Sequence, residues 1–373
     1  MRKHHPDNER IKRRHLQYLR EAKRLSEASV DQAAAAIAAF EASTGYRDFK
    51  KFHIEQARKF KRDLADQINP KSGKPLAKAT VRSRLMALKA FFQWLAGKQG
   101  YRSRIGYSDA EYFNLSANDT RIARAVRERP VPSLEQIRKA IAGIPTETDI
   151  QLRDRALIAF TLLSGARDNA IASMSLKHVD VERRLVHQDA REVRTKRAKT
   201  FTSSFFPVGD DIEVIVIEYF AHLRTNLLFG DDDPLFPATQ VALNEAGVFA
   251  AVGLERQHWT NATPIRRIFK NVFEAAGLTY FNPHSFRKTL VQLGERICRT
   301  PEEFKAWSQS LGHEQVLTTF TSYGVVSGER QAEIMTALKS QQGTEGEDFD
   351  QLDDAAIERI VAAFRREARA IRG

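Results

Sequence analysis

The hydrophobic positions in the first third of the chain follow the spacing of amphipathic helices. In the segment 79–97, apolar residues recur every three or four positions and form one stripe along a helix. That stripe consists of Val81, Leu85, Leu88, Phe92 and Leu95. Further helices are expected at 8–25, 30–42, 53–68 and 118–127. We therefore predict a helical domain over residues 26–128, preceded by a basic arm or helix at 1–25.

A different pattern begins after Pro130 and Pro132, which predict an extended linker because residues before prolines avoid the helical region. Helices are expected at 133–144 and 149–164, and helical spacing returns after Pro207. Between them, strand character is found at 184–188, 192–195 and 201–208, and loops are expected around 230–237 and 242–253. The second domain, 129–340, should therefore combine helices with a small antiparallel sheet. The fold class is α+β and mostly α.

The end of the chain has a third pattern. Acidic residues dominate 345–354, and apolar residues then recur at helical spacing up to Ile371. We predict an acidic linker and an amphipathic helix within 341–373. This helix would pack either on a neighbouring copy or on its own domain.

The net charge of the chain indicates what kind of partner it binds. The chain has 59 Lys and Arg against 47 Asp and Glu, a net charge of +12. Such an excess favours a polyanionic partner such as double-stranded DNA, although a basic enzyme with a solvated surface has the same balance. Cys298 is the single cysteine, so no intramolecular disulfide can form, as is typical of a reducing cytoplasm. No apolar run reaches the roughly 20 residues of a membrane span, and no membrane partner is expected.

The residue types needed to attack a phosphodiester without a metal occur in order along the second domain. The reaction needs an in-line nucleophile, cations around the phosphate and an acid for the leaving oxygen. The candidates are Arg167, Lys196, Lys199, His284, Arg287, His313 and Tyr323. Each has a more ordinary interpretation by itself, as a surface arginine, a solvated basic turn, a capping histidine or a core tyrosine. No histidine pair has metal-ligand spacing, and we expect neither a metal nor a cofactor.

In this order, these residues resemble the tyrosine recombinase, or phage integrase, family over residues 130–340. The segment 78–85 resembles that family's helical core-binding domain, and it provides the expected DNA-binding residues. These are Lys78, Thr80, Arg82 and Arg84. The resemblance implies a core-binding domain and a mixed catalytic domain that close around duplex DNA.

The resemblance also implies roles for the cations. Arg167 and Arg287 would clamp the phosphate, and Lys199 would protonate the departing 5′ oxygen, with Lys196 as the alternative acid. The family usually has an acidic residue three positions after the first arginine, where this chain has Ala170. We expect Asp168 or another carboxylate to support Arg167 instead.

The remaining roles belong to two histidines and a tyrosine. The resemblance implies that His284 assists Tyr323 in proton transfer, that His313 hydrogen-bonds the scissile phosphate, and that Tyr323 forms a 3′-phosphotyrosine intermediate. The interval from His313 to Tyr323 is one residue longer than the commonest family spacing. The loop that carries the tyrosine should therefore differ in shape.

We predict from this resemblance a cytoplasmic site-specific recombinase that cuts and rejoins duplex DNA by transesterification. It would act as a homotetramer on synapsed recombination sites, with accessory DNA-bending proteins as further partners. Two alternatives belong to other classes. A type IB topoisomerase-like enzyme would use the same residues on a single duplex, and a DNA-binding accessory protein would have lost one of the catalytic residues.

Overall fold

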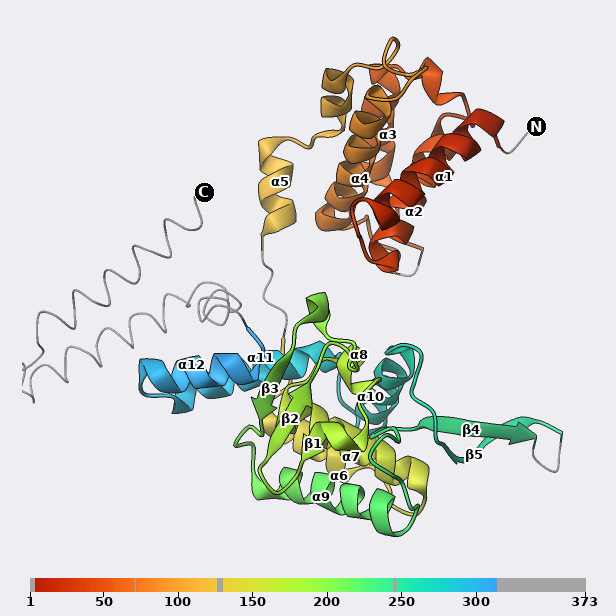
Figure 1. The fold of residues 1–373 in the computed structure, drawn as a ribbon. Helices are drawn as coiled ribbons and strands as arrows, with labels where there is room; N and C mark the ends of the chain where they lie inside the picture. The colour runs from red at the N-terminus through yellow and green to blue at the C-terminus, as the bar shows by residue number, and fades with distance from the viewer. Residues whose placement is uncertain (1–3, 71, 126–129, 244–246, 314–373) are drawn as a thin grey trace, which may run out of the picture. The chain divides into compact units, whose positions relative to one another are not determined.

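The computed structural model describes residues 4–70, 72–125, 130–243 and 247–313. The chain divides into two compact units, residues 1–127 and 128–373, each with its own hydrophobic core (Figure 1). The structure describes the predicted linker but neither the predicted tail nor the predicted nucleophile. Pro130 and Pro132 are described, whereas the tail of 341–373 and Tyr323 lie outside the described residues.

The first unit is helical, and the apolar stripe predicted from the sequence faces its core. Its α-helices are α1 (Pro6–Glu21), α2 (Glu27–Ser43), α3 (Ile54–Asp66), α4 (Lys78–Ala96) and α5 (Ala117–Arg124). Val81, Leu85 and Phe92 of α4 are at most 2% exposed. The basic helix α1 packs on the rest of the unit through Asn8, whose side chain donates to Glu41 at 2.9 Å and accepts the Phe49 N–H at 3.0 Å.

The second unit surrounds α7 with helices and a small sheet. Its α-helices are α6 (Leu134–Ala142), α7 (Asp149–Ser164), α8 (Asp168–Ile171), α9 (Asp210–Thr225), α10 (Thr263–Ala275), α11 (Pro283–Ile297) and α12 (Pro301–Ser310). An antiparallel sheet has the order β1 (Val179–Asp180), β2 (Leu185–Gln188), β3 (Phe201–Ser204). The predicted mixed, mostly helical fold is confirmed. None of the described helices combines the length and the apolar character that a membrane span requires.

The strand predicted at 192–195 is wrong. The Asp189 carbonyl accepts the N–H groups of Glu192 and Val193, at 3.0 and 2.7 Å, so the backbone turns here instead of extending. Val193 is buried without a strand partner. The strand predicted at 201–208 is shorter than expected and ends at Ser204, since the Phe206 N–H donates to the Leu163 carbonyl of α7.

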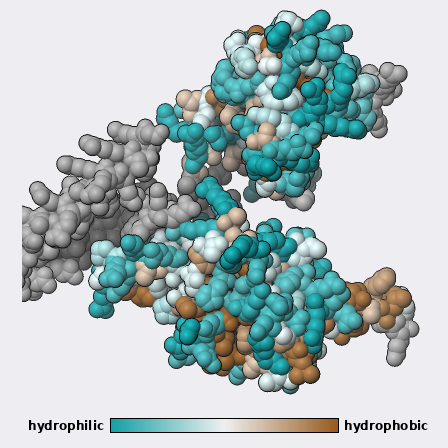
Figure 2. All heavy atoms as spheres, viewed as in Figure 1, coloured by the Kyte–Doolittle hydropathy of each residue, from teal (hydrophilic) through white to brown (hydrophobic). Residues whose placement is uncertain are grey.

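The loop predicted at 242–253 is also wrong. Most of this segment belongs to an antiparallel hairpin of β4 (Ala238–Leu243) and β5 (Phe249–Glu255), in which Leu243 lies opposite Phe249. The hairpin projects from the unit (Figure 1), and its outer part is strongly hydrophobic (Figure 2). Leu243 is 61% and Phe249 is 74% exposed. Cross-strand pairing between β4 and β5 determines the structure of this segment.

Candidate active site

Arg287 lies at the centre of the candidate site and is held by main-chain carbonyls. It belongs to α11, and only 4% of it is exposed. Its Nη1 donates to the carbonyl of Gly165, and its Nη2 donates to the carbonyl of Leu311 at 2.5 Å. Nη2 also lies 3.2 Å from Nε2 of His313. Arg287 therefore connects the end of α7 with the end of α12 and with one of the predicted histidines.

Arg167 stands at a corner that glycine makes possible. Helix α7 ends at Gly165 in the left-handed conformation, with φ of 60°. A Cβ atom at Gly165 would lie 3.0 to 3.1 Å from side chains of Phe206, Leu290 and Leu311. Arg167 follows as the N-cap of α8, and partial burial lowers its pKa. Among the described residues, its guanidinium has no hydrogen bond or ion pair, so it is available to an anion.

The carboxylate expected beside Arg167 has another partner. Asp168 accepts a hydrogen bond from Nε of Arg266 in α10, at 2.7 Å. The prediction that Asp168 supports Arg167 is therefore not met in this structure. The position with the family's usual acid, Ala170, is buried. Arg167 depends on the turn at Gly165 and on α8 for its place.

The lysine loop connects β2 with β3 and reaches the same site. Gln188 lies opposite Phe201 in the sheet, and residues 189–200 join them. Within the loop, Arg197 and Ala198 have left-handed φ values of 61° and 50°. Nζ of Lys199 donates to the carbonyl of Gly312 at 3.2 Å, directly before His313. Lys196 contributes to the positive potential at His284.

The two histidines are held neutral by these surroundings. Burial lowers the pKa of His313 to about 4, and the charges of Arg287, Arg167 and Lys199 contribute. The ring of His284 is accessible at the start of α11, yet partial burial and the charges of Arg287 and Arg167 lower its pKa as well. Their lowered pKa values keep both imidazoles neutral at neutral pH, so that each ring keeps one nitrogen as an acceptor. The site therefore offers fixed cations for a phosphate and neutral histidines for proton transfer.

The structure brings Arg167, Lys199, His284, Arg287 and His313 into one electrostatic cluster. Tyr323 lies outside the described residues. The predicted DNA-binding residues belong to the first unit, on α4. Thr80 is exposed and Arg82 partly exposed, while Lys78 pairs with Asp119 at 2.9 Å and Arg84 donates to Gln67 at 3.1 Å.

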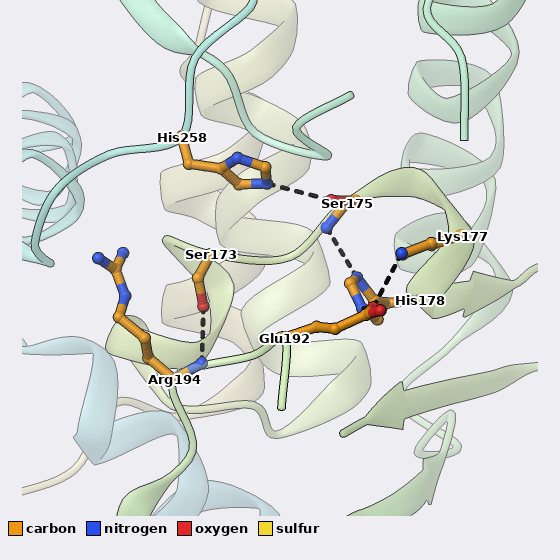
Figure 3. Close-up of a pocket in the computed structure, with 7 residues that line it drawn as sticks. All are labelled: Ser173, Ser175, Lys177, His178, Glu192, Arg194 and His258. Carbon is orange, nitrogen blue, oxygen red and sulfur yellow. Dashed lines mark hydrogen bonds and ion pairs between the residues drawn. The ribbon is translucent and has the colours of Figure 1, made fainter. Parts of the chain in front are cut away.

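Sequence reasoning missed Arg194, which precedes the lysine loop's turn. Its guanidinium donates to the carbonyls of Ala172, Trp259 and Thr260. Arg194 lines a polar hollow of about 430 Å³. Figure 3 shows the residues around this hollow and the hydrogen bond from the backbone N–H of Arg194 to the Ser173 hydroxyl. No spacing signal could have revealed it, because its partners are backbone atoms of distant segments.

Comparisons with known proteins agree with this arrangement. The phage integrase family pattern matches residues 133–329. Tyrosine recombinase XerC of Roseiflexus sp. strain RS-1 is 23% identical over 244 residues, which are 65% of this chain and 67% of that protein. Tyrosine recombinase XerD of Neisseria meningitidis serogroup B strain MC58 is 24% identical over 208 residues, which are 54% of this chain and 62% of that protein.

Solved structures share the fold. A lambda integrase (75–356) dimer bound to a COC′ core site superimposes with a TM-score of 0.58 at 12% identity, covering 86% of this chain and 96% of that one. The Tn1549 transposon integrase (82–397) in complex with circular intermediate DNA gives a TM-score of 0.55 at 13% identity, covering 87% and 98%.

Proposed function

Because the chain belongs to the phage integrase family and is a tyrosine-type site-specific DNA recombinase, we propose that it breaks and rejoins DNA with Tyr323 as the nucleophile. The observation that carries this proposal is the position of Arg287. Its hydrogen bonds to the carbonyls of Gly165 and Leu311 gather Arg167 and His313 around one point. Two arginines whose charges act on each other suit a phosphodiester, because a guanidinium keeps its positive charge and carries several N–H donors for phosphate oxygens.

The reaction is a transesterification that needs no external energy source. The Tyr323 oxygen forms a bond to phosphorus while the bond from phosphorus to the 5′ oxygen breaks. His284, which is neutral, accepts the phenolic proton, and Lys199 gives a proton to the leaving 5′ oxygen. Arg167, Arg287 and His313 stabilise the charge that develops on the non-bridging oxygens. The resulting 3′-phosphotyrosine keeps the bond energy, so attack by another 5′ hydroxyl rejoins the strand.

We propose duplex DNA as the substrate and a homotetramer on two synapsed sites as the active assembly, aided by DNA-bending proteins. The net charge of +12 and the partly exposed basic positions on α4 support the first part of this proposal. The neighbouring structures of lambda and Tn1549 integrases contain DNA, and the former is a dimer. Lys78, Thr80, Arg82 and Arg84 would contact the DNA backbone, and the helical unit would act as the second half of a clamp. The tail of 341–373 would link copies or fold back on its own unit, and we place the enzyme in the cytoplasm with its DNA.

The proposal is tested by trapping the covalent intermediate on a nicked suicide substrate. On this substrate, cleavage releases a short strand with a free 5′ hydroxyl, which diffuses away and cannot rejoin. The wild-type chain should form a protein–DNA adduct, and Tyr323→Phe should form none while it still binds DNA. Tyr280→Phe is the matched control, because Tyr280 is an exposed tyrosine of the same unit. An adduct that persists in Tyr323→Phe, or that maps to another peptide, would exclude Tyr323 as the nucleophile.

A further inference from the structure

We propose that Arg194 is a positioning residue for the leaving-group acid. It fixes the loop that carries Lys196 and Lys199 to the segment that follows Arg167. This inference rests on the proposed function, because the position of the loop matters to the reaction only if one of its lysines protonates the leaving oxygen.

The contacts of Arg194 all lead to main-chain or short polar groups. Nη2 donates to the carbonyl of Ala172 at 3.0 Å and to that of Trp259 at 2.5 Å, and Nη1 donates to that of Thr260 at 2.6 Å. The backbone N–H of Arg194 donates to Oγ of Ser173 at 2.9 Å (Figure 3). One residue thus joins the start of the loop to two other segments of the unit.

These segments lead directly to the active site. Ala172 caps the C-terminal end of α8, whose N-cap is Arg167. On the other side, Lys196 lies two residues after Arg194. Arg167 is therefore connected to the lysine loop by the short helix α8 and by the side chain of Arg194. Movement at Arg194 would move the lysines relative to Arg167.

The turn between Lys196 and Lys199 has few constraints of its own apart from the hydrogen bond of Lys199 to Gly312. Residues 196–198 form a single 3-10 turn that contains left-handed residues and no buried side chain. The segment that receives Arg194 is better anchored, since His258 beside it lies 3.2 Å from Oγ of Ser175, and Trp259 is only 6% exposed. Nη2 donates to carbonyls on both sides, those of Ala172 and Trp259, while Nη1 donates to that of Thr260. The rigid, planar fork of arginine holds these three acceptors in one arrangement, which the flexible side chain of lysine with its single nitrogen does not reproduce. Its role is therefore geometric rather than a matter of charge.

The chemistry of the leaving group separates this role from a general structural one. With a normal substrate, the P–O5′ bond breaks and the oxygen takes a proton from the lysine. With a 5′-bridging sulfur, the P–S bond breaks and the thiolate leaves without needing that proton. A displaced lysine should therefore slow the oxygen substrate and spare the sulfur substrate.

The experiment compares single-turnover adduct formation by the full chain on nicked oxygen and 5′-thio substrates. Arg194→Ala should form the adduct about 10²-fold more slowly than wild type on the oxygen substrate, which is the lower end of the range for general acid catalysis. On the sulfur substrate it should regain most of the wild-type rate. Arg194→Lys should behave like Arg194→Ala, because it keeps the charge and loses the fork. Arg191→Ala is the matched control, since this exposed loop arginine contacts Asp189, and it should behave as wild type.

Equal losses of Arg194→Ala on both substrates would overturn the inference. So would weaker DNA binding with a reduced salt dependence, which would make Arg194 a phosphate contact. If Arg194→Ala does not fold, Ser173→Ala removes the acceptor of the Arg194 backbone N–H and should give a smaller loss that sulfur also restores. The same loss on both substrates would again count against the inference.

Lysine variants separate failure of this inference from failure of the proposed function. If the 5′-thio substrate restores the rate of adduct formation in neither Lys196→Ala nor Lys199→Ala, the proposed acid role of these lysines is wrong. If sulfur restores one of them but not Arg194→Ala, only the positioning role is wrong.

Discussion

Lys199 and Gly312 are joined by a hydrogen bond of 3.2 Å from Nζ to the backbone carbonyl. This contact ties the lysine loop to the residue before His313. Lys196 is in a different situation, because among the described residues it has no hydrogen bond or ion pair, although its charge acts on His284. One lysine of the loop is therefore bound to the main chain, and the other has no partner within the part of the chain that the structure describes.

Lys199→Ala should slow cleavage by about 10²- to 10⁴-fold, and a 5′-thio leaving group should restore the rate, because a thiolate needs no acid. The measurement is single-turnover adduct formation on the two substrates. Lys196→Ala is the paired variant from the same loop. If sulfur restores only Lys196→Ala, then Lys196 is the acid and Lys199 serves to hold Gly312.

Gly312→Ala should damage the site through its backbone. The residue has φ of 65°, and an added Cβ would lie 2.5 Å from the Phe201 ring. The left-handed conformation costs about 1–2 kcal/mol for other residues, and overpacking adds about 1–3 kcal/mol. We expect a lower free energy of unfolding in urea and a larger loss of cleavage, because the strain falls beside Lys199 and His313.

Gly277→Ala is the control for this effect. Gly277 has a similar φ of 69°, but an added Cβ would meet nothing within 4 Å. It should show the conformational cost alone and keep its activity. The double variant Gly312→Ala, Phe201→Leu should regain part of the lost stability. No recovery would mean that the ring contact is not the source of the damage.

Replacing Lys78, Arg82 and Arg84 together with alanine should weaken DNA binding and make it less sensitive to salt. Each phosphate contact contributes about 0.9 to the slope of log affinity against log salt concentration, so the slope should fall by up to ~2.7. Thr80→Ala, on the same helix, removes no charge and should leave the slope unchanged. If the triple variant keeps the wild-type slope, these residues of α4 do not contact the DNA phosphates.

His15 should make the stability of the first unit depend on pH. Its ring is 2% exposed and packs 4.8 Å from the Trp94 ring, and burial followed by the charge of Lys98 lowers its pKa to about 4. Between this value and the ordinary 6.5, the unfolded chain binds the proton and the folded chain does not. Stability should therefore fall as pH decreases from about 6.5 to about 4, by up to ~3 kcal/mol.

Urea unfolding of the full chain at several pH values, followed by fluorescence, measures this dependence. His15→Phe should flatten the curve in that pH window. His53→Asn is the control in the same unit, because it removes an exposed imidazole and keeps a side chain that can cap α3. A wild-type slope in His15→Phe would show that other groups cause the loss.

Local sequence patterns were sufficient where one element decides its own structure. The stripe of α4 is buried as its spacing indicates, and α6 begins directly after Ser133, where a helix was expected, with Ser133 and Gln136 forming a capping box. The family resemblance singled out Arg167, Arg287 and His313 by their order along the chain. In the structure, Nη2 of Arg287 lies 3.2 Å from Nε2 of His313, and burial together with the charge of Arg167 lowers the pKa of both residues.

Predictions failed where partners distant in the sequence determine the structure. Whether 249–255 is a loop or a strand depends on pairing with β4, and the buried Arg153 holds that hairpin's base through the carbonyl of Pro237 and the hydroxyl of Thr239. Asp168 was expected beside Arg167, yet Arg266 from α10 takes its carboxylate. Sequence spacing contains no information about such competition between partners.

Among the described residues, carbonyl dipoles rather than carboxylates hold Arg287 and Lys199, and Arg167 has no counter-charge at all. The free enzyme thus keeps mutually repelling cations together with only partial compensation, at some expense of its own stability. Compared with the described residues around them, a bound phosphate would bring these groups a full negative charge. The repulsion that destabilises the empty site therefore strengthens the binding of a DNA phosphate, because the phosphate relieves that repulsion.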